Sequence, residues 1–214
     1  MLLGRSASSE DALLVRRTIS TAHSATPSSS HSIPNKHATR HGIPDTPQPP
    51  EGFIRLSGPL EHDNIVNGDG LRAVIWTQGC PNHCPGCQNP ETWDFEGGFL
   101  VSIDEILERL SKFRGQTGLT FCGGEPFVQP KACREIAERV RKEFGWNVWS
   151  FSGFTYEQIK EAGGEAWEFL KSLDALIDGP FILKQKDLSL RYRGSKNQRL
   201  LHLEPSSGKI VAVE

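Results

Sequence analysis

A short apolar run leads directly into three cysteines in Ala73-Val74-Ile75-Trp76-Thr77-Gln78-Gly79-Cys80-Pro81-Asn82-His83-Cys84-Pro85-Gly86-Cys87. Residues 73–77 have the composition of a buried β-strand. The cysteines follow with the spacing C-x3-C-x2-C, and the Pro and Gly residues between them let the backbone turn around a bound group. Random placement of five cysteines in this chain would give such a pattern roughly 0.003 times. The stretch therefore predicts a strand with a metal or cluster site at its carboxyl end.

From Phe53 onward, apolar runs alternate with amphipathic stretches, which is typical of βα units. Ser102 and Glu105 form a capping box that opens one helix. The chain from Phe53 is short for a closed eight-unit barrel of about 250 residues, so we expect a partial (β/α) barrel or an open, mainly parallel βα sheet. In both folds the loops after the strands gather at one edge, where ligands bind. We predict strands at 73–77, 119–121, 148–151, 175–177 and 200–203, and helices at 102–113, 130–144 and 155–170, the last interrupted near Gly163-Gly164.

Composition excludes several classes of partner. The formal net charge of -2 provides no basic field for nucleic acid or for an anionic membrane. No stretch approaches the roughly 18 apolar residues of a membrane span. The odd number of cysteines, in a chain with enough apolar residues for a core, argues against a disulfide scaffold. We therefore expect a soluble protein of a reducing compartment, the cytoplasm.

Residues 1–50 differ from the rest of the chain. They are rich in Ser, Thr and Pro and lack the apolar content that would offset the entropy of ordering. We expect a disordered tail over 1–50 and one domain over 51–214. An organellar targeting segment is the alternative, although Glu10 and Asp11 are unusual in one; the apolar run is too short for a secretory signal.

The number of cysteines in the loop bears on the kind of metal site. A structural zinc needs four protein ligands, and His83, Cys122 or Cys133 can supply the fourth, so zinc stays open at this point. Thiolates also suit iron–sulfur clusters. If only three cysteines hold a four-iron cluster, one iron is left for a ligand that is not protein.

The C-x3-C-x2-C loop after the first core strand resembles the signature of radical S-adenosylmethionine (SAM) enzymes. The resemblance implies a 4Fe-4S cluster on Cys80, Cys84 and Cys87, with SAM on the open iron. It also implies that reductive cleavage of SAM gives a 5'-deoxyadenosyl radical, so that the cofactors, and no catalytic side chain, supply the chemistry. The broad family usually has an aromatic residue before the third cysteine, where this chain has Gly86.

A narrower resemblance accounts for Gly86. The run from Cys80 to Trp93, with Gly86 and Asn-Pro-Glu-Thr-Trp at its end, is similar to the activating proteins of anaerobic ribonucleoside-triphosphate reductase. Asn67–Cys80 is similar to the stretch before the cluster loop in glycyl-radical activases generally. Asp178-Gly-Pro-Phe181 and Arg193-Gly-Ser-Lys-Asn-Gln-Arg199 resemble the same group. This resemblance covers most of the chain after residue 50.

A second loop, Thr120-Phe121-Cys122-Gly123-Gly124-Glu125-Pro126, resembles the turn that binds the methionine end of SAM in these enzymes. Two glycines bring the backbone close to a ligand, and the Glu125 carboxylate can accept from an ammonium group. On turn chemistry alone, an ordinary strand-to-helix turn is the more frequent explanation of the pattern, but the position of the loop after the next strand favours the functional interpretation. The resemblance implies SAM contacts at Gly123, Gly124, Glu125 and Pro126, and backbone contacts to its adenine end at Gly86, Cys87 and Gln88.

Other residues carry weaker signals. Ser152-Gly153-Phe154-Thr155 resembles a segment that lines the SAM pocket, and a plain loop with Thr155 as a helix N-cap is the alternative. Cys133 suits a helix core as a small apolar residue, and we prefer the same interpretation for Cys122. The one basic cluster is either a solvated surface or a docking surface for a larger protein. It consists of Lys184, Lys186, Arg191, Arg193, Lys196 and Arg199.

These observations support one leading hypothesis. The resemblance implies an enzyme that abstracts hydrogen from a glycine of a larger partner, anaerobic ribonucleoside-triphosphate reductase, with an electron donor such as flavodoxin or ferredoxin. The alternatives are an activase of another glycyl-radical enzyme, of the pyruvate formate-lyase type, or a small-molecule enzyme such as 7-carboxy-7-deazaguanine synthase. A metal-binding interaction module without catalysis is the alternative from a different class.

Overall fold

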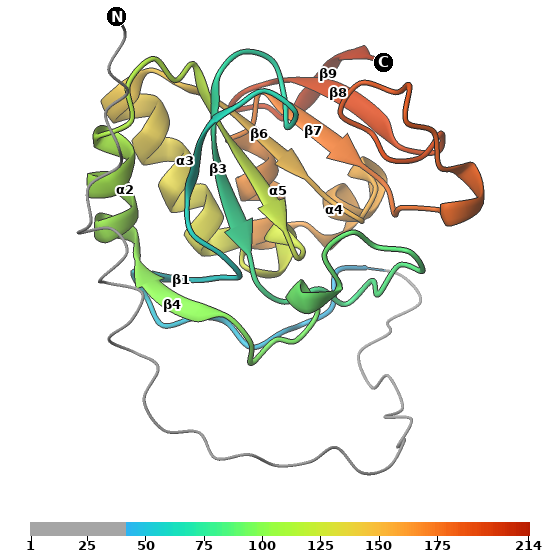
Figure 1. Ribbon diagram of the computed structural model, residues 1–214, viewed down its shortest axis with the longest axis horizontal. Helices are drawn as coiled ribbons and strands as arrows, with labels where there is room; N and C mark the ends of the chain where they lie inside the picture. Colours follow the sequence, from blue (N-terminus) through green and yellow to red (C-terminus); the bar gives the residue numbers. More distant parts are fainter. Residues whose placement is uncertain (1–41) are drawn as a thin grey trace, which may run out of the picture. The chain divides into compact units, whose positions relative to one another are not determined.

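A computed structural model describes residues 42–214 of the chain, which form one sheet with helices (Figure 1). Within these residues the strand order is β4-β1-β3-β5-β6-β7-β8-β9, and β2 pairs with β3 beside this path. Neighbouring strands are parallel from β3 to β7 and antiparallel everywhere else. The strands are β1 (Phe53–Leu56), β2 (Glu61–Asn64), β3 (Arg72–Thr77), β4 (Phe99–Ser102), β5 (Gly118–Gly123), β6 (Asn147–Phe151), β7 (Ala175–Asp178), β8 (Arg199–Glu204) and β9 (Lys209–Val213).

The helices cover one face of this sheet and leave the other to loops. Buried side chains of α2, α3 and α5 form one core with inward residues of the parallel strands, such as Ile75 and Phe121. A smaller cluster around Trp149 and Ile177 lies apart from that core, with Tyr192 packed against it. The helices are α2 (Ile103–Ser111), α3 (Pro130–Phe144), α4 (Tyr156–Ala162) and α5 (Gly164–Lys171), and the short 3-10 helices are η1 (Pro90–Thr92), η2 (Pro126–Val128) and η3 (Leu183–Gln185).

The open sheet with a parallel core confirms the predicted fold class, and each predicted strand is present. Local signals set the helix boundaries as expected. The Ser102 side chain accepts from the Glu105 backbone at the start of α2, and Thr155 and Gln158 form a complete capping box on α4. Gly163, at a φ of 62°, separates α4 from α5. The antiparallel margins β1, β2, β4 and β9 were not predicted.

Most of the predicted tail lies outside the described residues, and so does any targeting segment in it. The last part of it is described and contacts the domain. Thr46 is buried, and its hydroxyl donates to the Val128 carbonyl over 3.1 Å. The Gln48 side chain donates to the same carbonyl over 2.9 Å. In residues 42–214 no helix is both long and apolar enough to cross a membrane.

A buried arginine joins the parallel strands at the end opposite their carboxyl termini. Arg72 is 0% exposed. Its guanidinium donates to Thr120 Oγ1 and the Leu119 carbonyl of β5, and to the side chain of Asn147 in β6 over 2.8 Å. It also lies 5.0 Å from the Trp149 ring. None of these acceptors is a carboxylate, and burial lowers the pKa of Arg72 to about 10.

We expect Arg72→Ala to destabilise the fold by about 3 kcal/mol, because it leaves several buried acceptors without their donor. Urea unfolding of the metal-free protein measures this loss. The control is Arg114→Ala, at an exposed position, where we expect a change within about 0.5 kcal/mol. Equal stability of the two variants would contradict a structural role for the Arg72 contacts.

Candidate functional site

The cysteine loop and the glycine turn lie together because they follow neighbouring parallel strands, β3 and β5. Two hydrogen bonds of 2.8 Å join them. The Gly124 amide donates to the Thr77 carbonyl, and the Glu125 amide donates to the Gly79 carbonyl. The carboxyl edge of the sheet therefore holds the two sequence-predicted loops in direct contact.

Both glycines of the turn are required by this contact. A Cβ atom at Gly123, whose φ is 100°, would lie 2.5 Å from backbone atoms of Thr77. A Cβ atom at Gly124 would lie 2.4 Å from the Gly79 carbonyl oxygen. Backbone atoms cannot move aside as the end of a flexible side chain can. The two glycines thus permit the close approach of the loops.

The cysteine loop is held by its own backbone and by the residues that follow it. The amides of Gly79 and Cys80 donate to the carbonyls of Thr92 and Trp93, over 2.8 and 3.2 Å. The His83 ring stacks on Trp93 with 4.7 Å between ring centroids. These contacts fix the path of the loop on both sides of the cysteines.

Cys80, Cys84 and Cys87 line one cavity of about 720 Å³, a size in the range of small-molecule sites. Gly123, Gly124, Glu125, Gln88, Ser152 and Gly153 line the same cavity, whereas Gly86 and Pro126 are not among its lining residues. The indole N–H of Trp76, another lining residue, is buried without a hydrogen-bond partner among the described residues. The donor set and the unmet polar group fit a cluster with a polar ligand beside it.

Burial governs the protonation of the Cys80 and Cys84 thiols. It raises the pKa of Cys80 to about 12, and the nearby Glu125 carboxylate acts in the same direction. Burial also raises the pKa of Cys84. A protein thiol must lose its proton to bind a metal, and the charge of the metal drives that loss. The thiols of Cys80 and Cys84 are therefore protonated until a metal binds.

The remaining two cysteines occupy different places. Cys122 on β5 lines the cavity as well. Cys133 on α3 is fully buried in the main core, and its thiol contacts the Pro126 carbonyl at 3.6 Å. Within residues 42–214, no three His, Cys, Asp or Glu side chains gather closely enough to hold a single metal ion.

Glu125 is the polar centre of the site and is 1% exposed. One carboxylate oxygen accepts from the Phe127 amide over 3.1 Å and from the Ser152 hydroxyl over 2.9 Å. The other accepts from the Gly153 amide over 2.7 Å and from the Asn82 side chain over 3.3 Å. Glu125 therefore links the cysteine loop, its own turn and the loop after β6.

The sequence did not reveal this network. Asn82 carried no signal beyond its place between two cysteines. The segment 152–155 divides into two roles, since Ser152 and Gly153 contact Glu125 and line the cavity, while Thr155 caps α4. The interpretation of Thr155 as a helix N-cap is confirmed, whereas contact of the segment with SAM stays a prediction. Acceptance of an ammonium group by Glu125 stays a prediction.

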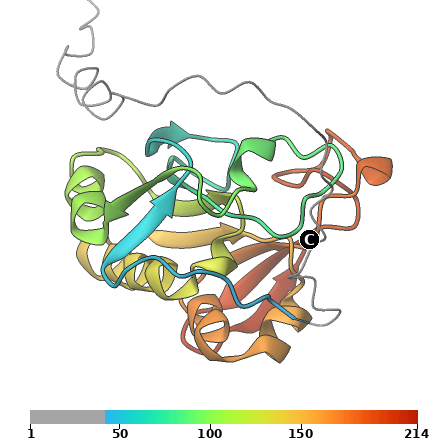
Figure 2. The same ribbon diagram turned by 90° about the horizontal axis from the view of Figure 1, so that it is seen from below.

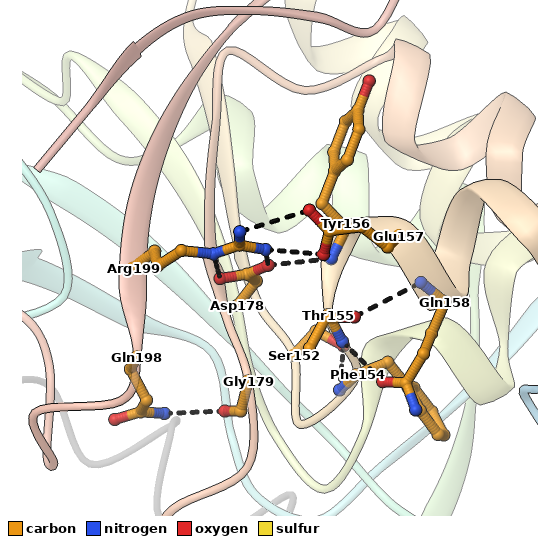
Figure 3. Close-up of polar contacts among 10 residues, drawn as sticks. All are labelled: Ser152, Phe154, Thr155, Tyr156, Glu157, Gln158, Asp178, Gly179, Gln198 and Arg199. Carbon is orange, nitrogen blue, oxygen red and sulfur yellow. Dashed lines mark hydrogen bonds and ion pairs between the residues drawn. The ribbon is translucent and has the colours of Figure 1, made fainter.

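The two downstream motifs meet where β7 ends and β8 begins, next to the start of α4 (Figure 3). The Asp178 carboxylate, buried at the end of β7, accepts from the Tyr156 amide over 2.8 Å and pairs with Arg199. Arg199 also pairs with Glu157 at 2.8 Å. The Gln198 side chain donates to the Gly179 carbonyl over 3.0 Å. Phe181 and Arg193, which belong to these motifs, line the cavity, and so do Leu188, Leu190 and Tyr192 between them.

Comparisons with known proteins give a family match and a distant structural match. Residues 66–201 match the family model described as a 4Fe-4S single cluster domain, so the chain carries an iron–sulfur cluster domain. The solved structure of QueE from Escherichia coli is similar with a TM-score of 0.40 and 15% identity, over 58% of each chain.

Three relatives share the name anaerobic ribonucleoside-triphosphate reductase-activating protein. The Escherichia coli protein is 33% identical over 148 residues, which are 65% of this chain and 94% of that protein. The Haemophilus influenzae protein is 32% identical, over 63% and 90%. The protein of Enterobacteria phage T4 is 35% identical, over 64% and 87%. The chain belongs to the family of anaerobic ribonucleoside-triphosphate reductase-activating proteins.

Burial raises the pKa of Glu125 to about 7 from an ordinary value of 4.5, and the amides of Gly153 and Phe127 offset part of the rise. Between these pH values the folded chain holds a proton that the unfolded chain has lost, so rising pH favours unfolding. We expect the free energy of unfolding of the wild type, measured relative to that of Glu125→Gln, to fall by up to about 3 kcal/mol from pH 4.5 to 7, because glutamine does not titrate.

Urea unfolding of both metal-free proteins at half-unit pH steps measures this difference. Glu51→Gln is the control, because Glu51 is exposed and pairs with Lys131 at the surface. A difference between wild type and Glu125→Gln that stays constant from pH 4.5 to 7 would contradict the raised pKa.

Proposed function

We propose that this protein is a radical SAM activating enzyme that generates a glycyl radical in an anaerobic ribonucleoside-triphosphate reductase. One observation carries the proposal: the three-cysteine loop and the Gly-Gly-Glu-Pro turn, joined by hydrogen bonds, line a single cavity in a chain of this family. The family implies a 4Fe-4S cluster and SAM as cofactors.

The residues of the site take distinct roles in this proposal. Cys80, Cys84 and Cys87 hold the cluster and leave one iron for SAM. When bound, the cluster supplies one electron, and cleavage of SAM yields the radical that abstracts hydrogen from glycine. Gly123 and Gly124 bring backbone groups to the methionine end of SAM, and Pro126 supports that turn. Residues 86–88 offer backbone contacts to its adenine end.

Glu125 keeps the loops in place for this reaction. Its four donors come from three segments of the chain, so its carboxylate sets the distance between the cysteine loop and the loop after β6. The same charge attracts the ammonium group of SAM. Both effects orient SAM toward the open iron.

Family membership favours the reductase over the other glycyl-radical partners that the sequence left open. Activases of pyruvate formate-lyase and small-molecule enzymes share the cofactors and differ in substrate. We also propose that a small one-electron donor, such as flavodoxin or ferredoxin, reduces the cluster. The partner test below separates these possibilities.

We expect Cys84→Ala to lose cluster iron and to lower SAM cleavage at least about a hundredfold, because two thiolates hold the cluster poorly. The control is Cys133→Ala, whose thiol lies in the core beneath α3. It should keep the iron and sulfide content of wild type. Iron and sulfide analysis and the yield of 5'-deoxyadenosine measure both variants after anaerobic reconstitution. Normal SAM cleavage by Cys84→Ala would overturn the cluster assignment.

We expect a glycyl-radical doublet in electron paramagnetic resonance (EPR) spectra when the reduced, reconstituted protein is mixed with SAM and the reductase of the same organism. A reductase whose radical glycine is replaced by alanine is the control and should give no doublet. Pyruvate formate-lyase in place of the reductase tests the alternative partner. One bound zinc without iron or sulfide would instead favour the non-catalytic module.

A further inference from the structure

The segment 179–198 projects from the edge of the sheet beyond β7 and lies beside the cysteine loop (Figures 1 and 2, in orange). The two segments touch, since a Cβ atom at Gly86 would lie 3.0 Å from the Leu183 side chain. We call residues 179–198 the rim loop, because its residues line one side of the cavity. Its position places it at the entrance to the site.

The rim loop is anchored at its base. Asp178 and Arg199, which flank it, form the ion pair described above, in which only the Asp178 carboxylate is buried, and the Gln198 side chain donates to the Gly179 carbonyl (Figure 3). The Asn197 side chain adds a donor to the Pro180 carbonyl over 2.7 Å. The two ends of the loop are therefore fixed side by side.

Two further anchors hold its middle. The buried Ser195 hydroxyl accepts from the Ile182 amide over 3.1 Å. The backbones of Ser195 and Lys186 also form an antiparallel β-bridge across the loop. Outside the loop, the Asp69 carboxylate accepts from the Arg191 guanidinium over 2.6 Å and from the Tyr192 hydroxyl over 2.7 Å. The loop is thus a fixed platform.

This platform presents apolar side chains to solvent. Leu188 is 82% exposed and Leu183 is 52% exposed. Ile65 and Val66, which also line the cavity, are 68% and 65% exposed. Large apolar side chains gathered around a cavity mouth are typical of a surface that binds another protein.

Positively charged side chains lie beside these exposed leucines on the rim loop. Between residues 182 and 196 there are five cationic side chains and one carboxylate, Asp187. Arg191 pairs with Asp69, and Lys196 pairs with Asp187. In the described part of the chain, Lys184, Lys186 and Arg193 have no carboxylate within ion-pair distance. An excess of unpaired positive charge therefore surrounds the exposed leucines.

We infer that the rim loop, together with Ile65 and Val66, is the docking surface for the reductase. The inference rests on the proposed function. The partner surface has acidic side chains that face Lys184, Lys186 and Arg193, and an apolar patch that covers Leu188. Docking there places the glycine-bearing segment at the mouth of the cavity lined by the three cysteines. Charge steers the encounter, and the leucine contact prolongs the complex.

The experiment measures binding of the reconstituted full-length protein to the reductase by anaerobic biolayer interferometry, with glycyl-radical EPR on the same samples. We expect the double variant Lys184→Glu/Lys186→Glu to bind at least about tenfold more weakly, mainly through slower association that depends on salt. Both lysines are exposed and do not line the cavity. Cleavage of SAM without the reductase should stay at the wild-type rate.

Two further variants sharpen the test. Lys142→Glu/Lys160→Glu makes the same charge change at exposed positions on α3 and α4 and should bind the reductase like wild type. Leu188→Ser should weaken binding about tenfold, through faster dissociation. Circular dichroism spectra confirm that each variant is folded.

Each outcome decides between the two proposals. Wild-type binding by both Lys184→Glu/Lys186→Glu and Leu188→Ser overturns the docking surface and leaves the proposed function intact. Equal weakening by the control pair also overturns it, since net charge then explains the effect. A change of oligomeric state in the rim-loop variants assigns the surface to a second copy of this chain and overturns it too. Absence of a glycyl radical with a wild-type protein that cleaves SAM overturns the proposed function itself.

Discussion

The site depends on two backbone hydrogen bonds between neighbouring loops. They join Thr77 to Gly124 and Gly79 to Glu125, and they form because β3 and β5 are parallel and in register. No Cβ atom fits at Gly123 or Gly124 at this distance. A parallel sheet brings two loops to one edge, but glycine is what lets them touch. Everything else in the site is arranged around this contact.

The sequence predicted those parts of the fold that have a strong local signal. Buried strands such as β3 are continuous apolar runs, and α2 and α4 begin at capping residues, so both can be recognised within a few positions. The strand β2 has the sequence Glu-His-Asp-Asn and is largely exposed, so no apolar pattern marks it. It forms because β1 pairs with β3 only at Thr77, so the rest of that edge of β3 is open to β2. This open stretch exists only in the assembled sheet.

The site, like the fold, has features with a local sequence signal and features that exist only after folding. Cysteine spacing and the two glycines pointed to the loops, because ligand type and backbone freedom are properties of single residues. The role of Asn82 and Ser152 depends on where Glu125 lies, and residues 27 or more positions apart meet there only after folding. Removing this carboxylate from water costs free energy, and its four hydrogen-bond donors offset that cost. The stability of the site is therefore sensitive to the loss of any one donor.

The contacts of Thr46 and Gln48 with Val128 have a practical consequence for the limits of the domain. Val128 ends the 3-10 helix η2, and its amide donates to the Glu125 carbonyl over 3.1 Å. Val128 therefore connects the chain before β1 to the turn at the centre of the site, through hydrogen bonds on both sides. A shortened protein that begins at the first strand would lose these hydrogen bonds to Val128.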